Sequence, residues 1–335
     1  MPSIDDLRNL KTLPESYKWK PTTSSNDRES IPVIDLADSD VVTRIGNACE
    51  TWGAFQIANH GIPSKLLDDV ESLSSSLFGL PTEQKLETAT QKNGIGGYGE
   101  ARIAPFFDSK MWSEGFTIVA GSYRQHFPTL WPHDYDKYCG IIEEYEEEMQ
   151  KLAGKLMGLI LGSIGVTEED IKWTGPNNSG LGSGSGAIRL NHYPVCPEPD
   201  QAMGLAAHTD STMVTILHQN NAAGLQMFKE GTGWVLVKPV PGLLVVNVGD
   251  LLHILSNGKL RSSLHQALVN KNKSRFSIAY LWGPSGDIDI SPISKLVSPI
   301  EPAMYRPVTW KEYLEMKARH FDKALSMIKA SPLTD

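Results

Sequence analysis

The sequence predicts an α+β protein, in which helices flank a barrel built from two antiparallel sheets. Two observations support this fold class. The part before Ala187 carries apolar residues at helical spacing, most clearly over residues 135–164. From Ala187 onward the chain changes to short β-rich segments separated by glycines and by an Asn257-Gly258 turn, which favours a double-sheet barrel over alternating strands and helices.

Four parts are expected along the chain. Residues 1–30 are polar apart from a short helical stretch at 4–13, so a flexible N-terminal arm is expected there. A mainly helical region follows at 31–176, the barrel at 187–285 and a C-terminal helical segment at 286–335. The glycine- and serine-rich stretch at 177–186 precedes an extended segment rather than a helix, so it is predicted to be a flexible loop and not a phosphate cradle.

The helical region begins with an extended segment at 31–35. Helices are then expected at Asp40–Trp52, Ser64–Leu80 and Glu83–Thr88, with a strand at Ala54–Asn59. Pro81 is expected to end the second helix, because proline lacks a backbone N–H. The long helix at 135–164 carries an acidic run, Glu143–Glu148, which is expected to be a solvated face rather than a docking surface.

The β-rich part contains seven expected strands, at residues 188–193, 213–218, 225–228, 234–239, 243–248, 264–269 and 274–282. A last helix is expected to begin at Thr309, because Glu312 follows it at the spacing of a capping box, and to run towards Lys329.

The most informative motif is His208-Thr209-Asp210, which is followed by His265 in a later β segment. On an extended strand, residues i and i+2 point to the same face about 6.6 Å apart, so the side chains of His208 and Asp210 can converge on one ion. His265 would complete the set from another strand. Two imidazoles and one carboxylate on one side of a metal leave its other positions open, which is the non-haem Fe(II) oxygenase pattern.

Arg275 and Ser277 also share a strand face. Their guanidinium and hydroxyl can hold the far carboxylate of a dicarboxylic cosubstrate through charge-assisted hydrogen bonds, although an ordinary ion pair is the alternative for Arg275. Tyr193 lies in Asn191-His192-Tyr193-Pro194 on a strand before the metal motif. Its hydroxyl is a candidate second contact to the cosubstrate, with a core hydrogen bond as the alternative.

Composition disfavours several other classes of partner. The formal net charge of −8 offers no attraction for phosphate backbones or anionic lipid. The three cysteines are widely separated and odd in number, which indicates a reducing compartment. The N-terminus has no apolar signal core. We expect a cytoplasmic, monomeric protein whose partner is a small molecule, with no nucleic acid or membrane partner.

These residues resemble the plant soluble branch of the 2-oxoglutarate- and Fe(II)-dependent dioxygenases, whose motifs are His-x-Asp, a distal His, Arg-x-Ser and Asn-x-Tyr-Pro. The resemblance covers nearly the whole chain. It implies a jelly-roll core, also called a double-stranded β-helix, flanked by helices. It also implies O2 as oxidant, ascorbate as reductant, Fe(II) on His208, Asp210 and His265, and 2-oxoglutarate on Tyr193, Arg275, Ser277 and Asn191.

Within that family, segments 111–117, 191–199, 204–211, 245–250, 253–258 and 324–328 look like those of gibberellin 3-oxidases. The resemblance implies hydroxylation of a gibberellin, a diterpenoid acid, at carbon 3 on the β face, which converts a precursor to an active hormone. Two features depart from that subfamily: the glycine-rich loop at 180–186, and Gln266 where a basic residue is usual. Oxidation at carbon 2, desaturation, or oxidation of another apolar plant metabolite are the alternatives.

A pocket for such a substrate needs apolar walls and a cation or hydroxyl. The candidates are Tyr98, Arg102, Phe106, Trp112, Phe116 and Arg189. Two readings from other classes stay open. A catalytically silent barrel would bind a metal or ligand without turnover. A zinc hydrolase would use the same metal ligands but would leave the Arg-x-Ser pair without a purpose.

Overall fold

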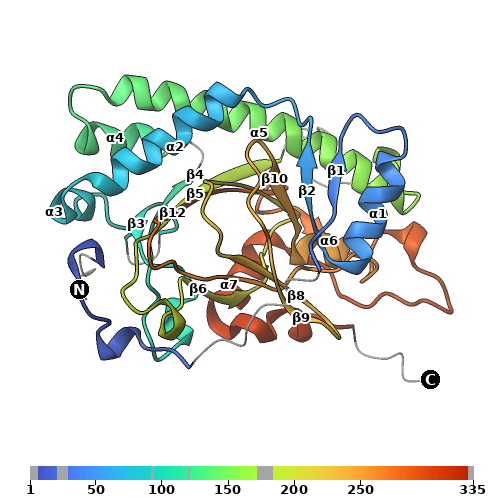
Figure 1. The fold of residues 1–335 in the computed structure, drawn as a ribbon. Coiled ribbons are helices and arrows are strands. Elements are labelled where there is room, and N and C mark those ends of the chain that lie inside the picture. The colour runs from blue at the N-terminus through green and yellow to red at the C-terminus, as the bar shows by residue number, and fades with distance from the viewer. Residues whose placement is uncertain (1–6, 21–28, 92–93, 120, 172–183, 331–335) are drawn as a thin grey trace.

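The computed structural model describes residues 7–20, 29–91, 94–119, 121–171 and 184–330. Helices and strands are mixed, and the strands form two main sheets (Figure 1). The larger sheet contains, in spatial order, β1 (Val33–Asp35), β2 (Ala54–Ala58), β10 (Leu244–Val248), β7 (Val214–Gln219), β12 (Arg275–Gly283), β5 (Ser185–Tyr193), β4 (Glu114–Val119) and β3 (Gly97–Gly99). The smaller sheet contains β6 (Leu205–His208), β11 (His265–Ala267), β8 (Leu225–Lys229) and β9 (Gly233–Leu236).

Neighbouring strands in both sheets are antiparallel, except that β1 runs parallel to β2. A separate pair joins β13 (Asp289–Ile290) to β14 (Val308–Thr309). The fold class expected from the sequence, a helix-flanked jelly roll, is confirmed by this arrangement and by the solved structures described below.

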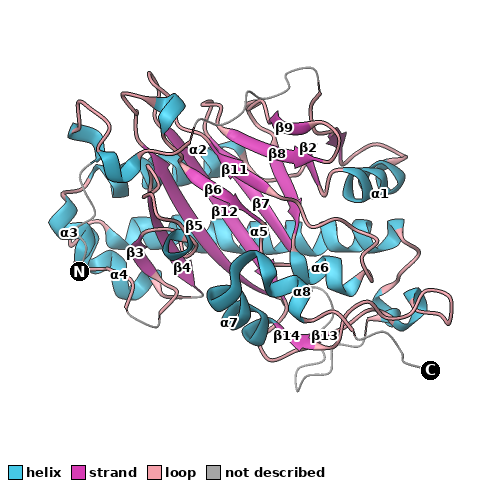
Figure 2. Ribbon diagram, turned by 90° about the horizontal axis from the view of Figure 1, so that it is seen from below, coloured by secondary structure: helices cyan, strands magenta, loops and turns pink. Residues whose placement is uncertain are grey.

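The helices are α1 (Val41–Thr51), α2 (Ser64–Gly79), α3 (Thr82–Leu86), α4 (Tyr123–Leu130), α5 (Tyr135–Ser163), α6 (Asp250–Leu255), α7 (Trp310–His320) and α8 (Ala324–Met327). The predicted long helix is confirmed as α5, which runs across one side of the larger sheet (Figure 2). Its acidic run lies largely exposed, between buried residues such as Tyr145 and Met149. Within the described ranges, no helix is long and apolar enough to cross a membrane.

The two faces of the larger sheet have different roles, and β12 shows this by alternation. Ile278, Tyr280 and Trp282 pack into the main core together with α5. Each fully buried large apolar side chain contributes roughly 1.5–3 kcal/mol, so this face anchors the sheet to the helices. The intervening residues, which include Arg275 and Ser277, point to the opposite face, between the two sheets.

The structure differs from the expected flexible arm over residues 7–20. Leu7, Leu13 and Tyr17 are buried, and the Tyr17 ring meets the Trp112 ring edge-on at 5.3 Å between centroids. In place of the expected helix there is a short 3-10 turn at Leu7–Asn9, and residues 4–6 lie outside the described ranges. These isolated apolar residues have no periodicity, so their burial could not be predicted from the sequence.

Two further boundaries differ from the prediction. The expected loop at 177–186 overlaps β5, which already begins at Ser185, whereas residues 177–183 lie outside the described part of the chain. The expected helix from Thr309 begins as predicted, with the Thr309 hydroxyl accepting from the Glu312 N–H at 3.1 Å. It ends at His320 because Phe321 adopts a positive φ of 48°, a conformation that stops a helix.

Candidate active site

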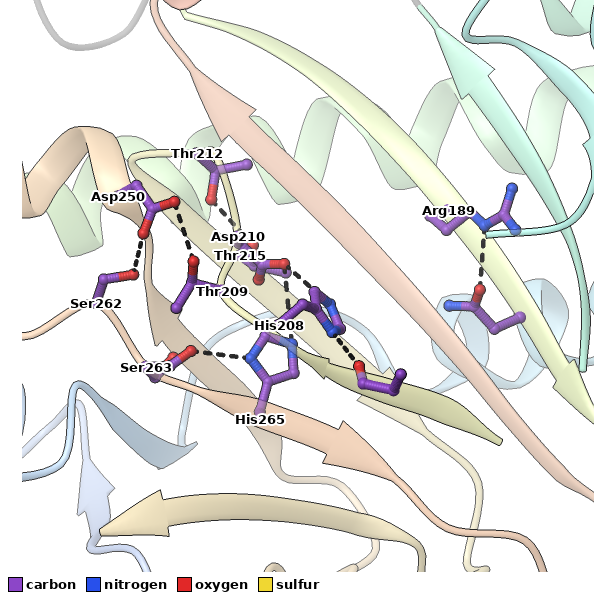
Figure 3. Close-up of polar contacts among 12 residues, drawn as sticks. Arg189, His208, Thr209, Asp210, Thr212, Thr215, Asp250, Ser262, Ser263 and His265 are labelled. Atoms are coloured by element: carbon purple, nitrogen blue, oxygen red, sulfur yellow. Dashed lines mark hydrogen bonds and ion pairs between the residues drawn. The ribbon is translucent and has the colours of Figure 1, made fainter. Parts of the chain in front are cut away.

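The side chains of His208, Asp210 and His265 converge at the β6–β11 pair of the smaller sheet. His208 ends β6 and is paired across the ladder with His265, the first residue of β11. Asp210 lies just beyond the end of β6, in a turn rather than on the extended strand that the sequence suggested. One ligand atom from each residue lies within 4.8 Å of the other two (Figure 3). Asp210 Oδ1 is 3.6 Å from His208 Nε2 and 3.8 Å from His265 Nε2.

Hydrogen bonds on the far side of each imidazole fix its tautomer. His208 Nδ1 lies 2.9 Å from the Ala206 carbonyl oxygen, and His265 Nδ1 lies 3.0 Å from that of Ser263. A carbonyl oxygen only accepts, so each Nδ1 carries the hydrogen and each Nε2 keeps a lone pair. Burial, and then the neighbouring His265, lower the pKa of His208 to about 4. His208 is therefore a neutral ligand at neutral pH.

Asp210 completes a site that suits a cation. Although burial opposes ionisation, His265 and His208 lower the pKa of its carboxyl group below the usual value. Its Oδ2 atom is buried and has no hydrogen-bond partner. A buried carboxylate oxygen without a partner is costly, and a divalent ion would satisfy it. Two imidazole nitrogens and one carboxylate with open positions fit Fe(II).

A buried arginine lies on the larger sheet. Arg275 is 1% exposed and lies opposite Tyr193 in the β12–β5 ladder. Its Nη2 donates to Gln219 Oε1 at 2.9 Å, its guanidinium carbon lies 4.9 Å from the Tyr193 ring centre, and its buried Nε has no partner. Burial lowers the pKa of Arg275, while Tyr193 raises it. No carboxylate in the described ranges pairs with it, so an anion can.

Ser277 and Asn191 lie on the same face of the larger sheet as Arg275. They are paired in the β12–β5 ladder, and Asn191 Nδ2 donates to Ser277 Oγ at 3.4 Å. Two glycines leave room for the larger side chains. A Cβ at Gly224 would approach Arg275 Cδ to 2.9 Å, and one at Gly204 would approach Tyr193 Cδ1 to 2.7 Å. The sequence identified the pair but gave no sign of these close approaches or of Gln219.

Three of the expected substrate residues lie in the core instead. Tyr98 is 1% exposed and donates its hydroxyl hydrogen to Glu114, which Lys85 and His192 also contact. Phe116 is opposite Tyr98 in the β3–β4 ladder and is fully buried on the helix-facing side. Trp112 is fully buried, with its indole N–H donating to the Pro194 carbonyl at 3.2 Å. Aromatic residues look the same in a sequence whether they line a pocket or a core.

Arg189 does point between the sheets, on the face it shares with Asn191 (Figure 3). It donates to Asn191 Oδ1 at 3.1 Å, to Thr117 Oγ1 at 2.9 Å and to the Gly99 carbonyl at 3.1 Å. All three acceptors are neutral. Burial lowers the pKa of Arg189 to about 10, so it stays charged at neutral pH. Gly115 makes space for it, because a Cβ there would lie 2.1 Å from Arg189 Nη2.

Phe106 and Arg102 lie in the exposed segment before β4. Phe106 stacks on Phe321 at 5.0 Å between ring centroids, and Phe107 meets Phe321 edge-on at 5.5 Å. This aromatic cluster, Phe106, Phe107 and Phe321, joins the segment to the end of α7. Phe106 and Phe107 of this cluster line an open hollow of about 700 Å³, which is also lined by Gln266, the residue after His265. Arg102 has no hydrogen bond or ion pair within the described chain, so its expected role gains no support from a contact.

Comparison with known proteins agrees with a site for Fe(II) and 2-oxoglutarate. Residues 184–284 match the model of the 2OG-Fe(II) oxygenase superfamily, and residues 31–134 match that of the N-terminal region of non-haem dioxygenases in morphine synthesis. Gibberellin 3-beta-dioxygenase 4 of Arabidopsis thaliana is 62% identical, over 97% of this chain and 96% of its own. Gibberellin 3-beta-dioxygenase 1 of Pisum sativum is 52% identical, over 97% of this chain and 89% of its own.

Among solved structures, JOX2 in complex with 2OG, Fe and JA superposes with a TM-score of 0.82 at 31% identity, covering 96% of this chain and 95% of that one. The rice dioxygenase for auxin oxidation superposes with a TM-score of 0.72 at 25% identity, covering 90% of this chain and 100% of that one. The chain belongs to the 2OG-Fe(II) oxygenase superfamily and, within it, to the family of the gibberellin 3-beta-dioxygenases.

Proposed function

We propose that this protein hydroxylates a gibberellin at carbon 3 on the β face and so converts a precursor to an active hormone. The observation that carries the proposal is the near-complete match to gibberellin 3-beta-dioxygenases, together with a group of three possible metal ligands and a buried arginine that no described carboxylate neutralises. A buried, unpaired charge costs stability, so a catalytically silent barrel would not be expected to keep Arg275 buried without an anion.

His208, Asp210 and His265 are proposed to hold Fe(II) through two neutral Nε2 atoms and one carboxylate. Arg275, Ser277 and Tyr193 are proposed to bind the far carboxylate of 2-oxoglutarate, with Asn191 orienting the Ser277 hydroxyl. When bound, Fe(II) and 2-oxoglutarate supply the oxidation: O2 is consumed, the keto acid becomes succinate and carbon dioxide, and a substrate C–H becomes C–OH. Ascorbate is proposed to keep the iron reduced.

The protein's own task is then to present one C–H bond of a rigid substrate. Arg189 is proposed to bind the carboxylate of the gibberellin, because it lies between the sheets and its hydrogen-bond partners are all neutral. The aromatic cluster of Phe106, Phe107 and Phe321 is proposed to border the substrate entrance. A charge at one point and an apolar wall at another would orient the skeleton.

The test is aerobic incubation of the protein with iron, ascorbate and 2-oxoglutarate against a panel of nineteen-carbon gibberellins, with products identified by mass spectrometry. We expect a product hydroxylated at carbon 3 and one succinate for each hydroxylation. A product oxidised only at carbon 2 would overturn the assigned position. A lack of succinate formation with every gibberellin would favour the silent barrel.

Two variants make the same assay a test of the metal site. Asp210→Ala is expected to abolish product, because it removes the only anionic ligand of the triad. Asp287→Ala removes an exposed carboxylate and is expected to leave turnover unchanged.

The cellular setting is also proposed. The three cysteines are buried and free, which suits the reducing cytoplasm. We propose that the protein acts there as a monomer, which sedimentation of the purified protein would test.

A further inference from the structure

One lysine of the C-terminal helix reaches the turn that carries the metal ligands. Lys317 of α7 places its Nζ 2.6 Å from the Thr209 carbonyl oxygen and 2.7 Å from Thr209 Oγ1. The same Nζ lies 2.5 Å from Asp250 Oδ2. Thr209 is the residue between His208 and Asp210. All three donors of the ammonium group are thereby directed at this turn and at the carboxylate beside it.

Asp250, the first residue of α6, holds the turn from its other side. Its backbone N–H donates to the Asp210 carbonyl at 2.8 Å, and its Oδ2 accepts from the Thr209 hydroxyl at 3.0 Å. Tyr313 of α7 donates to the same Oδ2 at 2.9 Å. Ser262 donates to Oδ1 at 2.6 Å, as Figure 3 shows. The carboxylate of Asp250 is thus saturated with donors, and none of its bonds reaches a metal ligand's side chain.

The burial of this ion pair indicates a purpose beyond stability. The side chain of Lys317 is 12% exposed and that of Asp250 is 2% exposed. Removing two charges from water costs nearly as much as their attraction returns, so a buried pair is weak evidence for stabilisation. The pair does fix geometry, because it joins α7, α6 and the ligand turn through short, directed bonds.

Asp210 depends on such support. Its Oδ2 has no hydrogen-bond partner among the described residues, while a side-chain hydrogen bond from Thr215 reaches the carboxyl group. The direction of the carboxylate also depends on the backbone on either side of it, which Asp250 and Lys317 hold.

We infer that Lys317 is a positioning residue for the metal site: through Thr209 and Asp250 it sets the direction in which His208 and Asp210 present their ligand atoms. The inference rests on the proposed role of that triad as the metal ligands. Lys317 itself touches neither metal nor substrate.

The experiment measures metal affinity without turnover. Apo-protein is titrated with Mn(II) in the absence of 2-oxoglutarate, and free Mn(II) is followed by electron paramagnetic resonance. Lys317→Met keeps the length of the side chain but removes its charge and hydrogen bonds. We expect its affinity to fall by roughly 10- to 100-fold, the range found when groups that orient metal ligands are lost. Lys311→Met makes the same change at an exposed position of α7 and is expected to leave the affinity unchanged.

A second variant separates positioning from stability. Lys317→Met leaves the buried Asp250 carboxylate without its cation, which can unfold the protein. Lys317→Met combined with Asp250→Asn removes both charges, and thermal melting is expected to show a more stable protein than the single variant. Its Mn(II) affinity is expected to stay low, because the contacts to Thr209 are still missing.

Each outcome decides between the claims. Wild-type affinity in Lys317→Met, or affinity that returns together with stability in the double variant, would show a structural role only and overturn the inference. If the wild-type protein binds no Mn(II), the proposed metal site fails first, and the role of Lys317 fails with it.

Discussion

Arg275 carries a buried charge that no carboxylate of the described chain neutralises. If 2-oxoglutarate supplies that anion, Arg275→Ala removes one partner of a buried pair, which costs about 3–5 kcal/mol. The KM for 2-oxoglutarate is then expected to rise steeply, as measured by succinate formation at varied cosubstrate. Arg319→Ala, at an exposed position of α7, is the matched control. An unchanged KM in Arg275→Ala would remove the anchor role.

The proposed role of Arg189 can be tested separately from that of Arg275. Arg189 lies on β5, whereas Arg275 lies on β12, and the hydrogen bonds of Arg189 go to neutral groups. Arg189→Met is expected to raise the KM for a gibberellin acid while the KM for 2-oxoglutarate stays near the wild-type value. Loss of one charged hydrogen-bonding partner is worth about 1.5–3 kcal/mol, or roughly 10- to 150-fold. Measurement with the methyl ester of the same gibberellin supplies the control. If the variant affects acid and ester equally, Arg189 does not bind the carboxylate.

The metal-free site should make stability depend on pH. The pKa of His208 is lowered from 6.5 to about 4, first by burial and then by His265. Between these pH values the unfolded chain binds more protons at this position than the folded chain, so stability rises with pH across that window. Melting temperatures of apo-protein are expected to fall as pH drops from about 6.5 to about 4, more steeply for wild type than for His208→Gln. Equal slopes would contradict the shift.

The convergence of His208, Asp210 and His265 was predictable from their spacing, whereas the residues that hold them in place were not. His208, Asp210 and His265 form a pattern that few other functions require. Lys317 is separated from Thr209 by 108 positions, and nothing in the local sequence of a helix announces a polar partner so far away.

At the scale of elements, α7 connects the segment of the proposed metal ligands to the aromatic cluster of Phe106, Phe107 and Phe321. Lys317 contacts the segment that carries His208 and Asp210, and α7 ends three residues later at His320, just before Phe321. The positive φ of Phe321 costs about 1–3 kcal/mol for a residue other than glycine. Contacts with Phe106 and Phe107 offset that cost and hold the helix end against the segment before β4.

Phe321→Ala keeps the unfavourable backbone but removes both ring contacts. Each aromatic pair is worth about 0.5–1.5 kcal/mol within the protein, so the loss of both is expected to lower the melting temperature. Because Phe106 and Phe107 are then no longer held in place, the KM for the gibberellin is expected to rise several-fold. The KM for 2-oxoglutarate is expected to stay constant. Met327→Ala, which trims an exposed side chain of α8, serves as the control. A gibberellin KM that does not change in Phe321→Ala would place the aromatic cluster outside the substrate path.

Helices and strands could be predicted from the sequence where periodicity was strong, as in α5. Which elements pack or pair with one another could not be predicted. β2 lies beside β10, with Ile57 opposite Leu244, and alternation alone cannot name a partner so distant in the chain. The docking of Tyr17 on Trp112 was likewise missed, since one aromatic ring in an irregular segment has no period.

For the whole molecule, the decisive feature is that the two halves of the site belong to different sheets. The proposed metal ligands come from β6, β11 and the turn after β6 in the smaller sheet, and the proposed anion-binding residues come from β5 and β12 in the larger one. A cosubstrate bound to both the metal and Arg275 would therefore tie the sheets together, and its binding would oppose their separation during unfolding.

This coupling predicts a definite order of thermal shifts. Mn(II), which does not support turnover in this test, is expected to raise the melting temperature, and 2-oxoglutarate to raise it further only when Mn(II) is present. A ligand at a hundredfold its Kd stabilises by about 2.7 kcal/mol. In Arg275→Ala the Mn(II) shift should persist and the 2-oxoglutarate shift should vanish, because the metal half is intact and the anion pocket is not. A chelator should return wild type to its starting value. If 2-oxoglutarate stabilised Arg275→Ala as much as wild type, the cosubstrate would not span the two sheets, and the anion that neutralises Arg275 would have to be a different molecule.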